Sequence, residues 1–245
     1  MKTEEIENLF VNFILKQVGP TETREEERNS KLQIVKQLIE NSLSEYYPDL
    51  IPHIFPYGSF PIKTYLKEAD IDITIIFENK NTHQILIDLS QEIINSILYS
   101  IKDCFENYNL QIRQNLFVDI NIINADIQLI KCKMKSISFD ISINNYFGLL
   151  KILFMNFIFN QIELKNNNLN GDNKLIMFRK TILLIKAWCI SEGNLIGSNI
   201  GLMASYALEI LILYMFNIYH KEIENEIDGF FYFFYLTFIR FPNNQ

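Results

Sequence analysis

In YGSFPIKTYLKEADIDITIIF, residues 57–77, a Gly-Ser pair is followed by ten residues of spacer and then by Asp-Ile-Asp within an otherwise apolar run. The last part of this stretch, residues 71–77, predicts a strand because β-branched and aromatic residues dominate it. Asp70 and Asp72 are two residues apart, so an extended chain turns both carboxylates to the same side of a sheet. Parallel carboxylates repel each other unless a cation lies between them. The stretch therefore indicates a cation site at the edge of a buried strand.

The composition of the chain limits the kinds of protein that it can be. It has 245 residues, of which 49% are hydrophobic, and a formal net charge of −7. This length can bury a sizeable core in one large domain or two small ones. The acidic balance argues against a free-standing, high-affinity nucleic-acid binder, which would normally be basic. A nucleic-acid substrate stays compatible with it where a local patch or a partner subunit supplies positive charge.

Cysteine usage and hydropathy favour an intracellular protein. The three cysteines, Cys104, Cys132 and Cys189, are widely spaced and form no CxxC pair, which favours reduced thiols over a disulfide framework or a zinc site. The N-terminal segment MKTEEIENLF is acidic where a signal peptide would be basic and then apolar. The longest apolar runs are interrupted and too short to span a bilayer. We therefore expect the cytoplasm or the nucleus, and no membrane partner.

The pattern of apolar residues predicts an α+β fold. Helical spacing is expected over residues 3–18, about 21–46, near 82–104, 145–163, 175–192, 199–219 and 228–240. Strand-like runs are expected at residues 51–55, 71–77, about 110–123, 127–134 and 137–143. We therefore expect N-terminal helices over residues 1–48 that pack on the helical domain, a small mixed-sheet domain over 49–143 and an all-helical domain over 144–245.

Gly58 and Ser59 follow an expected strand and precede a short segment that can begin a helix. A glycine at this place lets the backbone approach a ligand closely. The N–H groups of a helix start can then hold an anion, most often a phosphate. Lys63 lies one turn further on and adds positive charge. The order of the motif predicts an anion held opposite Asp70 and Asp72.

A third carboxylate would complete a metal site. Paired carboxylates suit Mg²⁺, which proteins commonly hold with a few carboxylates plus substrate phosphates. Asp140, in ISFDISI, has apolar neighbours on both sides, and we favour it over Asp119 and Asp126. An Asp-x-Asp pair alone is most often a solvated strand face and a Gly-Ser pair alone is a turn, so the prediction depends on their ordered combination.

The ordered Gly-Ser, Asp-x-Asp and later Asp resemble the nucleotidyltransferase superfamily that includes DNA polymerase beta, poly(A) polymerases and oligoadenylate synthetases. The segment FPYGSFPIKTYLKEADIDIT is most similar to the poly(A)/poly(U) polymerase-like branch, and within it to plant poly(A) polymerase/oligoadenylate-synthetase substrate-binding-domain proteins. The segment KTILLIKAWCISEGNLIGSNIGLMASYALEILILYMFN is similar to the central-domain helices of that group. The resemblance covers roughly residue 51 to the C-terminus and implies a nucleotidyltransferase catalytic domain over 49–143.

The resemblance implies a role for each matching residue of this domain. Gly58 and Ser59 would hold the triphosphate, with Ser59 near its terminal phosphate. Asp70, Asp72 and Asp140 would bind two Mg²⁺ or Mn²⁺ ions, and two such ions can activate an attacking oxygen and stabilise the leaving pyrophosphate. Asp140 would also lie next to the attacking 3′-hydroxyl.

Three further roles fall in the helical domain. Lys186 would reach the phosphates, Ser205 would meet them and Tyr206 would stack on the base. Two positions depart from the family pattern. Lys151 replaces an asparagine that contacts the ribose, and Ile190 replaces a second basic residue one helical turn after Lys186.

The resemblance implies an enzyme that adds nucleotides from ATP or UTP to an RNA 3′ end without a template, with release of pyrophosphate. A catalytically inactive scaffold subunit of an RNA-processing or other complex is the second candidate, favoured by the two departures and the acidic charge. An oligoadenylate-type synthase of a nucleotide messenger is the third. Because the resemblance also implies an incomplete helical domain, we expect a protein partner or a second copy to cover the aromatic residues of its last segment. These are Phe230, Phe231, Phe233, Phe234, Tyr235 and Phe238.

Overall fold

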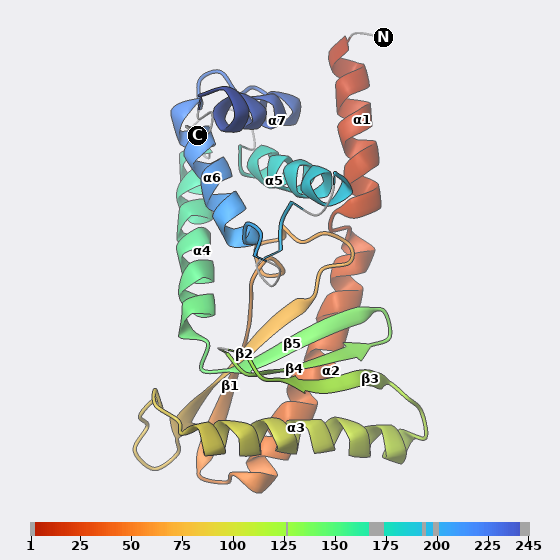
Figure 1. The fold of residues 1–245 in the computed structure, drawn as a ribbon, viewed down its shortest axis with the longest axis vertical. Coiled ribbons are helices and arrows are strands. Elements are labelled where there is room, and N and C mark those ends of the chain that lie inside the picture. The colour runs from red at the N-terminus through yellow and green to blue at the C-terminus, as the bar shows by residue number, and fades with distance from the viewer. Residues whose placement is uncertain (1–2, 126, 167–173, 193–194, 198–200, 241–245) are drawn as a thin grey trace. The chain divides into compact units, whose positions relative to one another are not determined.

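The structure, a computed structural model, describes residues 3–125, 127–166, 174–192, 195–197 and 201–240 (Figure 1). It is of the α+β class, as the sequence predicts. The elements follow in the order α1 (Thr3–Val18), α2 (Glu22–Tyr46), β1 (Leu50–Tyr57), β2 (Ile71–Asn79), α3 (Gln91–Ile112), β3 (Phe117–Ile123), β4 (Leu129–Met134), β5 (Ile137–Ile143), α4 (Tyr146–Asn166), α5 (Lys174–Ser191), α6 (Ser205–Ile218), α7 (Glu226–Phe234) and the π-helical segment η2 (Tyr235–Arg240).

The chain divides into two compact units, which we call the sheet unit and the helical unit. The sheet unit comprises Glu22–Pro61 and Glu68–Leu153, and the helical unit comprises Met1–Thr21, Ile62–Lys67 and Phe154–Gln245. This division differs from the domain boundaries expected at residues 48 and 143. Helix α2 packs against α3 and β1 within the sheet unit, whereas α1 packs against α5 and α7 within the helical unit.

The sheet unit contains one five-stranded mixed sheet. Its strand order is β1-β2-β5-β4-β3, with β2 and β5 parallel and every other pair antiparallel. Alternate side chains of the central strands, Ile71, Ile73, Phe139 and Ile141, are fully buried. Because side chains alternate along a strand, the residues between them face the opposite side of the sheet. Asp72 and Asp140 are carried by these central strands, and Asp70 directly precedes β2.

Helix α3 is the element that differs most from its expected position. It begins at Gln91, where the Ser90 side chain caps it, and it ends at Ile112, which is followed by Arg113 with a left-handed φ of 53°. The strand expected from about residue 110 therefore begins only at Phe117. The side chain of Asn109 fixes this arrangement, since it bonds the backbone oxygen of Phe117 at 2.7 Å and its backbone nitrogen at 3.0 Å.

The aromatic C-terminal segment packs largely within the helical unit. Phe233 is buried, and the ring of Phe234 meets Trp188 of α5 edge-on, with ring centroids 4.5 Å apart. Phe230 packs against a buried cluster of α1 and α5 residues, namely Val11, Leu15, Leu183 and Leu184. Helices of the same unit therefore supply much of the covering that we expected from a partner.

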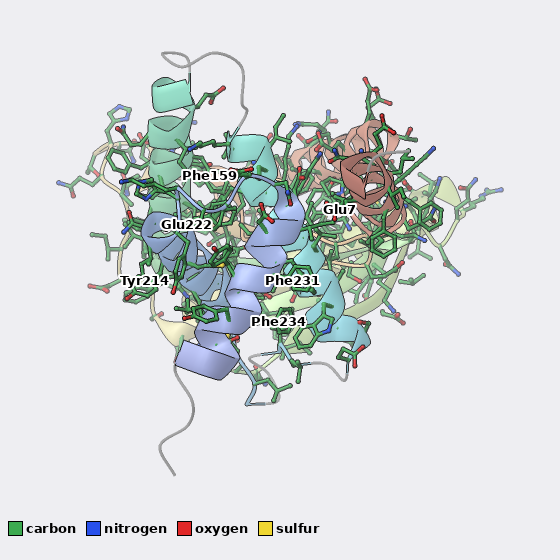
Figure 2. All side chains as sticks on the ribbon, turned by 90° about the horizontal axis from the view of Figure 1, so that it is seen from above. Glu7, Phe159, Tyr214, Glu222, Phe231 and Phe234 are labelled. Carbon is green, nitrogen blue, oxygen red and sulfur yellow. The ribbon has the colours of Figure 1, made fainter. Side chains whose placement is uncertain are left out.

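Two described side chains of this segment stay in contact with water. Phe231, labelled in Figure 2, is 65% exposed, and Tyr235 is 44% exposed. The side chain of Phe238 lies outside the described residues. Among the described side chains of this segment, a partner would therefore have only Phe231 and Tyr235 to cover.

Cys104, Cys132 and Cys189 are free, and the last two are buried. Within the described ranges, no helix combines the length and the apolar character that crossing a membrane requires.

Candidate functional site

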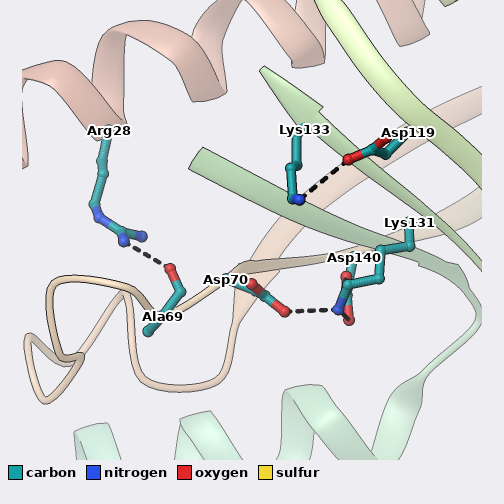
Figure 3. A network of polar contacts seen from close by, with 7 residues as sticks. All are labelled: Arg28, Ala69, Asp70, Asp119, Lys131, Lys133 and Asp140. Atoms are coloured by element: carbon teal, nitrogen blue, oxygen red, sulfur yellow. Dashed lines mark hydrogen bonds and ion pairs between the residues drawn. The ribbon is translucent and has the colours of Figure 1, made fainter. Parts of the chain in front are cut away.

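The sheet brings the three predicted aspartates together. Asp72 of β2 lies directly opposite Asp140 of the parallel neighbour β5. Directly paired residues of adjacent strands point to the same face of a sheet, so these two carboxylates are neighbours. Asp70 joins them through Lys131 of β4, whose ammonium lies 2.8 Å from Asp70 Oδ2 and 3.2 Å from Asp140 Oδ1 (Figure 3). We call Asp70, Asp72 and Asp140 the acidic centre.

Burial and mutual repulsion disfavour the charged form of the carboxylates in the acidic centre. The pKa of Asp72 is raised to about 7, chiefly by burial and then by the negative charges of Asp140 and Asp70, against the opposing charge of Lys131. Burial also raises the pKa of Asp140, although Lys131 acts in the opposite direction. Such shifts mark a group whose charged form is poorly compensated, which is common at functional sites. The centre would be stabilised by more positive charge than Lys131 supplies.

Lys131 is a site residue that the sequence reasoning missed. It pairs with Asp140 in the antiparallel register of β4 and β5. Burial lowers the pKa of Lys131, but its hydrogen bond to Asp70 and the charges of Asp140 and Asp70 outweigh this and raise it, so the side chain stays charged. The alternation of LIKCKM could have placed Lys131 and Lys133 on one face of a strand. Only the register shows which of the two meets the aspartates.

Gly58 lies against the acidic centre. Its φ of +71° suits glycine, and an added Cβ atom would lie 2.3 Å from Asp72 Oδ2. No other residue can occupy this position without displacing the carboxylate. The Gly-Ser turn is therefore beside Asp72, as its place in the sequence predicts. The helix start expected after it is not formed, because residues 58–63 make successive turns, so the proposed phosphate-binding N–H groups of a helix end are absent there.

A polar network supports the strands that carry the aspartates. The hydroxyl of Tyr57, which pairs with Asp72 in the sheet, accepts a hydrogen bond of 3.0 Å from Asn145 Nδ2 and lies 3.4 Å from Ser142 Oγ. Asn145 Oδ1 in turn accepts a bond of 2.9 Å from the nitrogen of Gly148 in the first turn of α4. An added Cβ atom at Gly148 would lie 2.8 Å from the Tyr57 ring. The network joins β1, β5 and the start of α4 close to Asp72.

The competing candidates for the third carboxylate do not join the centre. Asp119 of β3 has a left-handed φ of 53° and forms an ion pair of 3.1 Å with Lys133, whereas Asp70 and Asp140 pair with Lys131 (Figure 3). Asp126 lies outside the described residues. The carboxylate that the register places beside Asp72 is that of Asp140.

The donor set suits a divalent ion, although its present arrangement does not enclose one. Among the described residues, no three His, Cys, Asp or Glu side chains are placed to hold a metal ion. Asp140 Oδ1 is buried and, although the Lys131 ammonium is near, it has no hydrogen-bond partner. Clustered carboxylate oxygens are the ligands that Mg²⁺ and Mn²⁺ prefer. The residues therefore fit such an ion provided that Lys131 moves away from them.

The three predicted residues of the helical unit differ in exposure. Lys186 is only 4% exposed, and its ammonium bonds Glu209 Oε1 at 2.5 Å and the main-chain oxygen of Thr64 at 3.0 Å. The Thr64 hydroxyl donates to the same Glu209 oxygen at 2.7 Å. Ser205 begins α6 and is exposed, whereas Tyr206 is half-buried. Lys186 is thus part of a buried ion pair, and its contact with a phosphate stays a prediction.

Two family models match the chain. Residues 10–156 match the model described as "Poly(A) RNA polymerase, mitochondrial-like, central palm domain". Residues 172–243 match the model described as "PAP/OAS1 substrate-binding domain". Protein HESO1 of Arabidopsis thaliana is a curated relative, 27% identical over 164 residues, which make up 66% of this chain and 28% of HESO1.

Solved polymerase structures share the fold. Cid1, in a structure that addresses its RNA terminal uridylyl transferase activity, has a TM-score of 0.56 at 16% identity, over 84% of this chain and 53% of Cid1. The polymerase core of TRAMP, an RNA surveillance complex, has a TM-score of 0.59 at 16% identity, over 91% of this chain and 60% of that one. The chain thus spans little more than half the length of these polymerases and a smaller share of HESO1.

Proposed function

Since the chain belongs to the poly(A) RNA polymerase, mitochondrial-like, central palm domain family, we propose that it is a metal-dependent nucleotidyltransferase acting on RNA 3′ ends. It would add nucleotides from ATP or UTP without a template and release pyrophosphate. The observation that carries the proposal is the register of β2 and β5, which makes Asp72 and Asp140 direct neighbours with Asp70 close by. An RNA substrate in the cytoplasm or the nucleus is part of the proposal.

Different residues of the sheet unit would bind the metal ions and the phosphates. Asp70, Asp72 and Asp140 would hold Mg²⁺ or Mn²⁺, which when bound supplies charge for the attacking and leaving oxygens. Gly58 lacks a side chain and so leaves space for the Asp72 carboxylate beside the turn. Ser59, the next residue of this turn, would hold a phosphate. Catalysis of phosphoryl transfer consists chiefly of such positioning and charge neutralisation.

Substitution within the acidic centre tests the proposal. The Asp72→Asn variant keeps the size of the side chain but removes one negative oxygen ligand, so we expect nucleotide transfer to fall by about two orders of magnitude or more. The assay would combine each labelled NTP with Mg²⁺ and a short oligoribonucleotide, and would size the products on a gel. The matched control is Asp119→Asn, a strand carboxylate outside the centre, which should retain activity.

The product pattern separates the enzyme from its alternatives. A ladder extending the oligoribonucleotide supports the proposal and identifies the base, whereas short or cyclic oligonucleotides made without it would favour a messenger synthase. Equal activity in Asp72→Asn and the unmodified protein would reject the assigned centre.

An inactive subunit of an RNA-processing or other complex is a second candidate, and two observations favour it. Lys186, the phosphate contact expected in the helical unit, is buried against Glu209, and the second basic position is Ile190. Thermal unfolding with and without Mg²⁺ and NTP separates the two functions. A complete lack of stabilisation by any NTP, together with no transfer, would favour the inactive subunit.

A further inference from the structure

The acidic centre already contains a cation of its own. The ammonium of Lys131 lies 2.8 Å from Asp70 Oδ2 and within 3.3 Å of both carboxylate oxygens of Asp140 (Figure 3). A divalent ion held by Asp70 and Asp140 needs some of the same oxygen atoms. It would also be repelled by an ammonium at this distance, because like charges a few ångströms apart interact strongly in a half-buried site. The two cations therefore compete.

We propose that Lys131 is the resting counter-cation of the acidic centre, and that a divalent ion binds by displacing its ammonium from Asp70 and Asp140. The inference rests on the proposed function, because it takes these aspartates as the metal ligands. It assigns to Lys131 a positioning role: the side chain neutralises the carboxylates while no metal is bound.

The chemistry of lysine suits such an exchange. Its ammonium is a compact point charge on a flexible stem, whereas the planar guanidinium of arginine holds carboxylates in two parallel bonds. The Lys131 side chain is 43% exposed, so its charge can turn to water without a large loss of hydration. Asp140 Oδ1 is buried and has no hydrogen-bond partner although the Lys131 ammonium lies 3.2 Å away, so Lys131 only partly compensates the centre. A divalent ion, with twice the charge, would compensate it better.

Strand β4 offers a matched control for this residue. Lys133 is two residues further along the strand, so it projects from the same face, and it forms an ion pair of 3.1 Å with the exposed Asp119. Lys131→Met and Lys133→Met each keep an apolar stem of similar length and each remove one positive charge. A change in net charge affects both variants equally, and any difference between them is local to the acidic centre.

The experiment measures Mn²⁺ binding to the full chain by calorimetry at pH 8, without nucleotide, after treatment with EDTA and its removal. We expect Lys131→Met to bind Mn²⁺ about tenfold more tightly than the unmodified protein, because the competing charge is gone. Its melting temperature in EDTA should fall, since the carboxylates lose their counter-cation. Lys133→Met should match the unmodified protein in both measurements. Lys131→Arg should bind Mn²⁺ more weakly, because its bidentate bonds are harder to displace.

The outcomes for the two proposals are separable. Equal Mn²⁺ affinity in Lys131→Met and Lys133→Met, or weaker binding in Lys131→Met, overturns the exchange, and so does the absence of Mn²⁺ binding in every variant. If Lys131→Arg binds as tightly as Lys131→Met, the exchange is overturned as well. The expected order of affinities in a protein that transfers no nucleotide leaves the exchange standing and rejects the proposed function. If the protein transfers nucleotides but Lys131→Met and Lys133→Met bind Mn²⁺ equally, the proposed function stands and the exchange is rejected.

Discussion

At the scale of single residues, the candidate site depends on close approach. Asp72 Oδ2 leaves no room for a Cβ atom at Gly58, and Asp72 pairs with Asp140 across the strand pair. An atom or charge added at one of these residues therefore affects the position or the charge state of the others.

Gly58→Ala should damage the site more than the backbone change alone explains. The new methyl group would lie 2.3 Å from Asp72 Oδ2, so the carboxylate or the turn has to shift. Gly201 provides the control, because its φ of +79° is also left-handed but an added Cβ atom there meets nothing within 4 Å. We expect each alanine to lower the free energy of unfolding by about 1 kcal/mol through backbone strain. In urea titrations Gly58→Ala should lose more than Gly201→Ala, and it alone should bind Mn²⁺ more weakly; equal behaviour would contradict the contact.

Asp72 should make the stability of the metal-free protein depend on pH. Its pKa is about 3.8 in an ordinary setting and about 7 in the fold, so between these values the folded chain binds a proton that the unfolded chain releases. Stability therefore falls as the pH rises through this window and is lowest above it. In EDTA at pH 8, Asp72→Asn should be more stable than the unmodified protein by about 1–3 kcal/mol. The gap should close as the pH falls towards 4.

Asp119→Asn is the control for this pH dependence, because its carboxylate is exposed and paired with Lys133. It should show no gain at pH 8. Chemical denaturation followed at several pH values measures both variants, and a gap for Asp72→Asn that does not change with pH would contradict the prediction.

At the scale of elements, a buried ion pair links two helices of the helical unit. Lys186 of α5 and Glu209 of α6 form an ion pair that also holds Thr64, a residue of the segment between β1 and β2 that belongs to the helical unit. A buried pair is weak evidence for net stability, yet removing one partner leaves the other charge without compensation. The pair therefore fixes the positions of α5, α6 and this segment relative to one another.

Glu209→Gln should be strongly destabilising because it leaves the Lys186 ammonium buried with only neutral partners. We expect a loss of about 3–5 kcal/mol in the free energy of unfolding. The partly exposed pair of Lys180 and Glu226, which joins α5 and α7 at 3.1 Å, is the control. Glu226→Gln should cost clearly less, and the double variant Lys186→Met with Glu209→Leu should recover most of the loss. A small effect of Glu209→Gln would show that Lys186 is free to leave the pair.

At the scale of the whole molecule, the two units are interleaved along the chain. The helical unit takes α1 and the segment Ile62–Lys67 as well as the residues from Phe154 onward. A fragment that ends at Leu153 would therefore keep Tyr65 and Leu66 without most of the helical unit to which they belong. Tyr65 is almost fully buried, and Leu66 packs against the cluster of α1 and α5. The segment that separates Gly58 from Asp70 is thus anchored in the helical unit, while both ends of the motif belong to the sheet unit.

The local pattern of the sequence determined most of the elements and the order of the motif. The β-branched and aromatic residues of 71–77 and 137–143 predicted β2 and β5, because such side chains pack well on a buried, pleated sheet. The order of the motif predicted that Gly58, Asp70, Asp72 and Asp140 belong together. Asp72 and Asp140 lie on neighbouring strands, Asp70 directly precedes β2 and Gly58 directly follows β1. Local pattern failed at the end of α3, where the bonds of Asn109 to Phe117, and not the β-like run at 110–116, decide the boundary.

Tertiary structure alone decided which charges meet. The register of β4 and β5 sets Lys131, not Lys133, against Asp140, and the packing of α5 on α6 sets Lys186 against Glu209. These partners are separated by nine residues in the first pair and twenty-three in the second. A local pattern reports which side of a strand or helix a residue occupies, but the partner across a sheet or between helices depends on how the whole chain packs. That is why the carboxylates could be predicted from the sequence and their counter-cation could not.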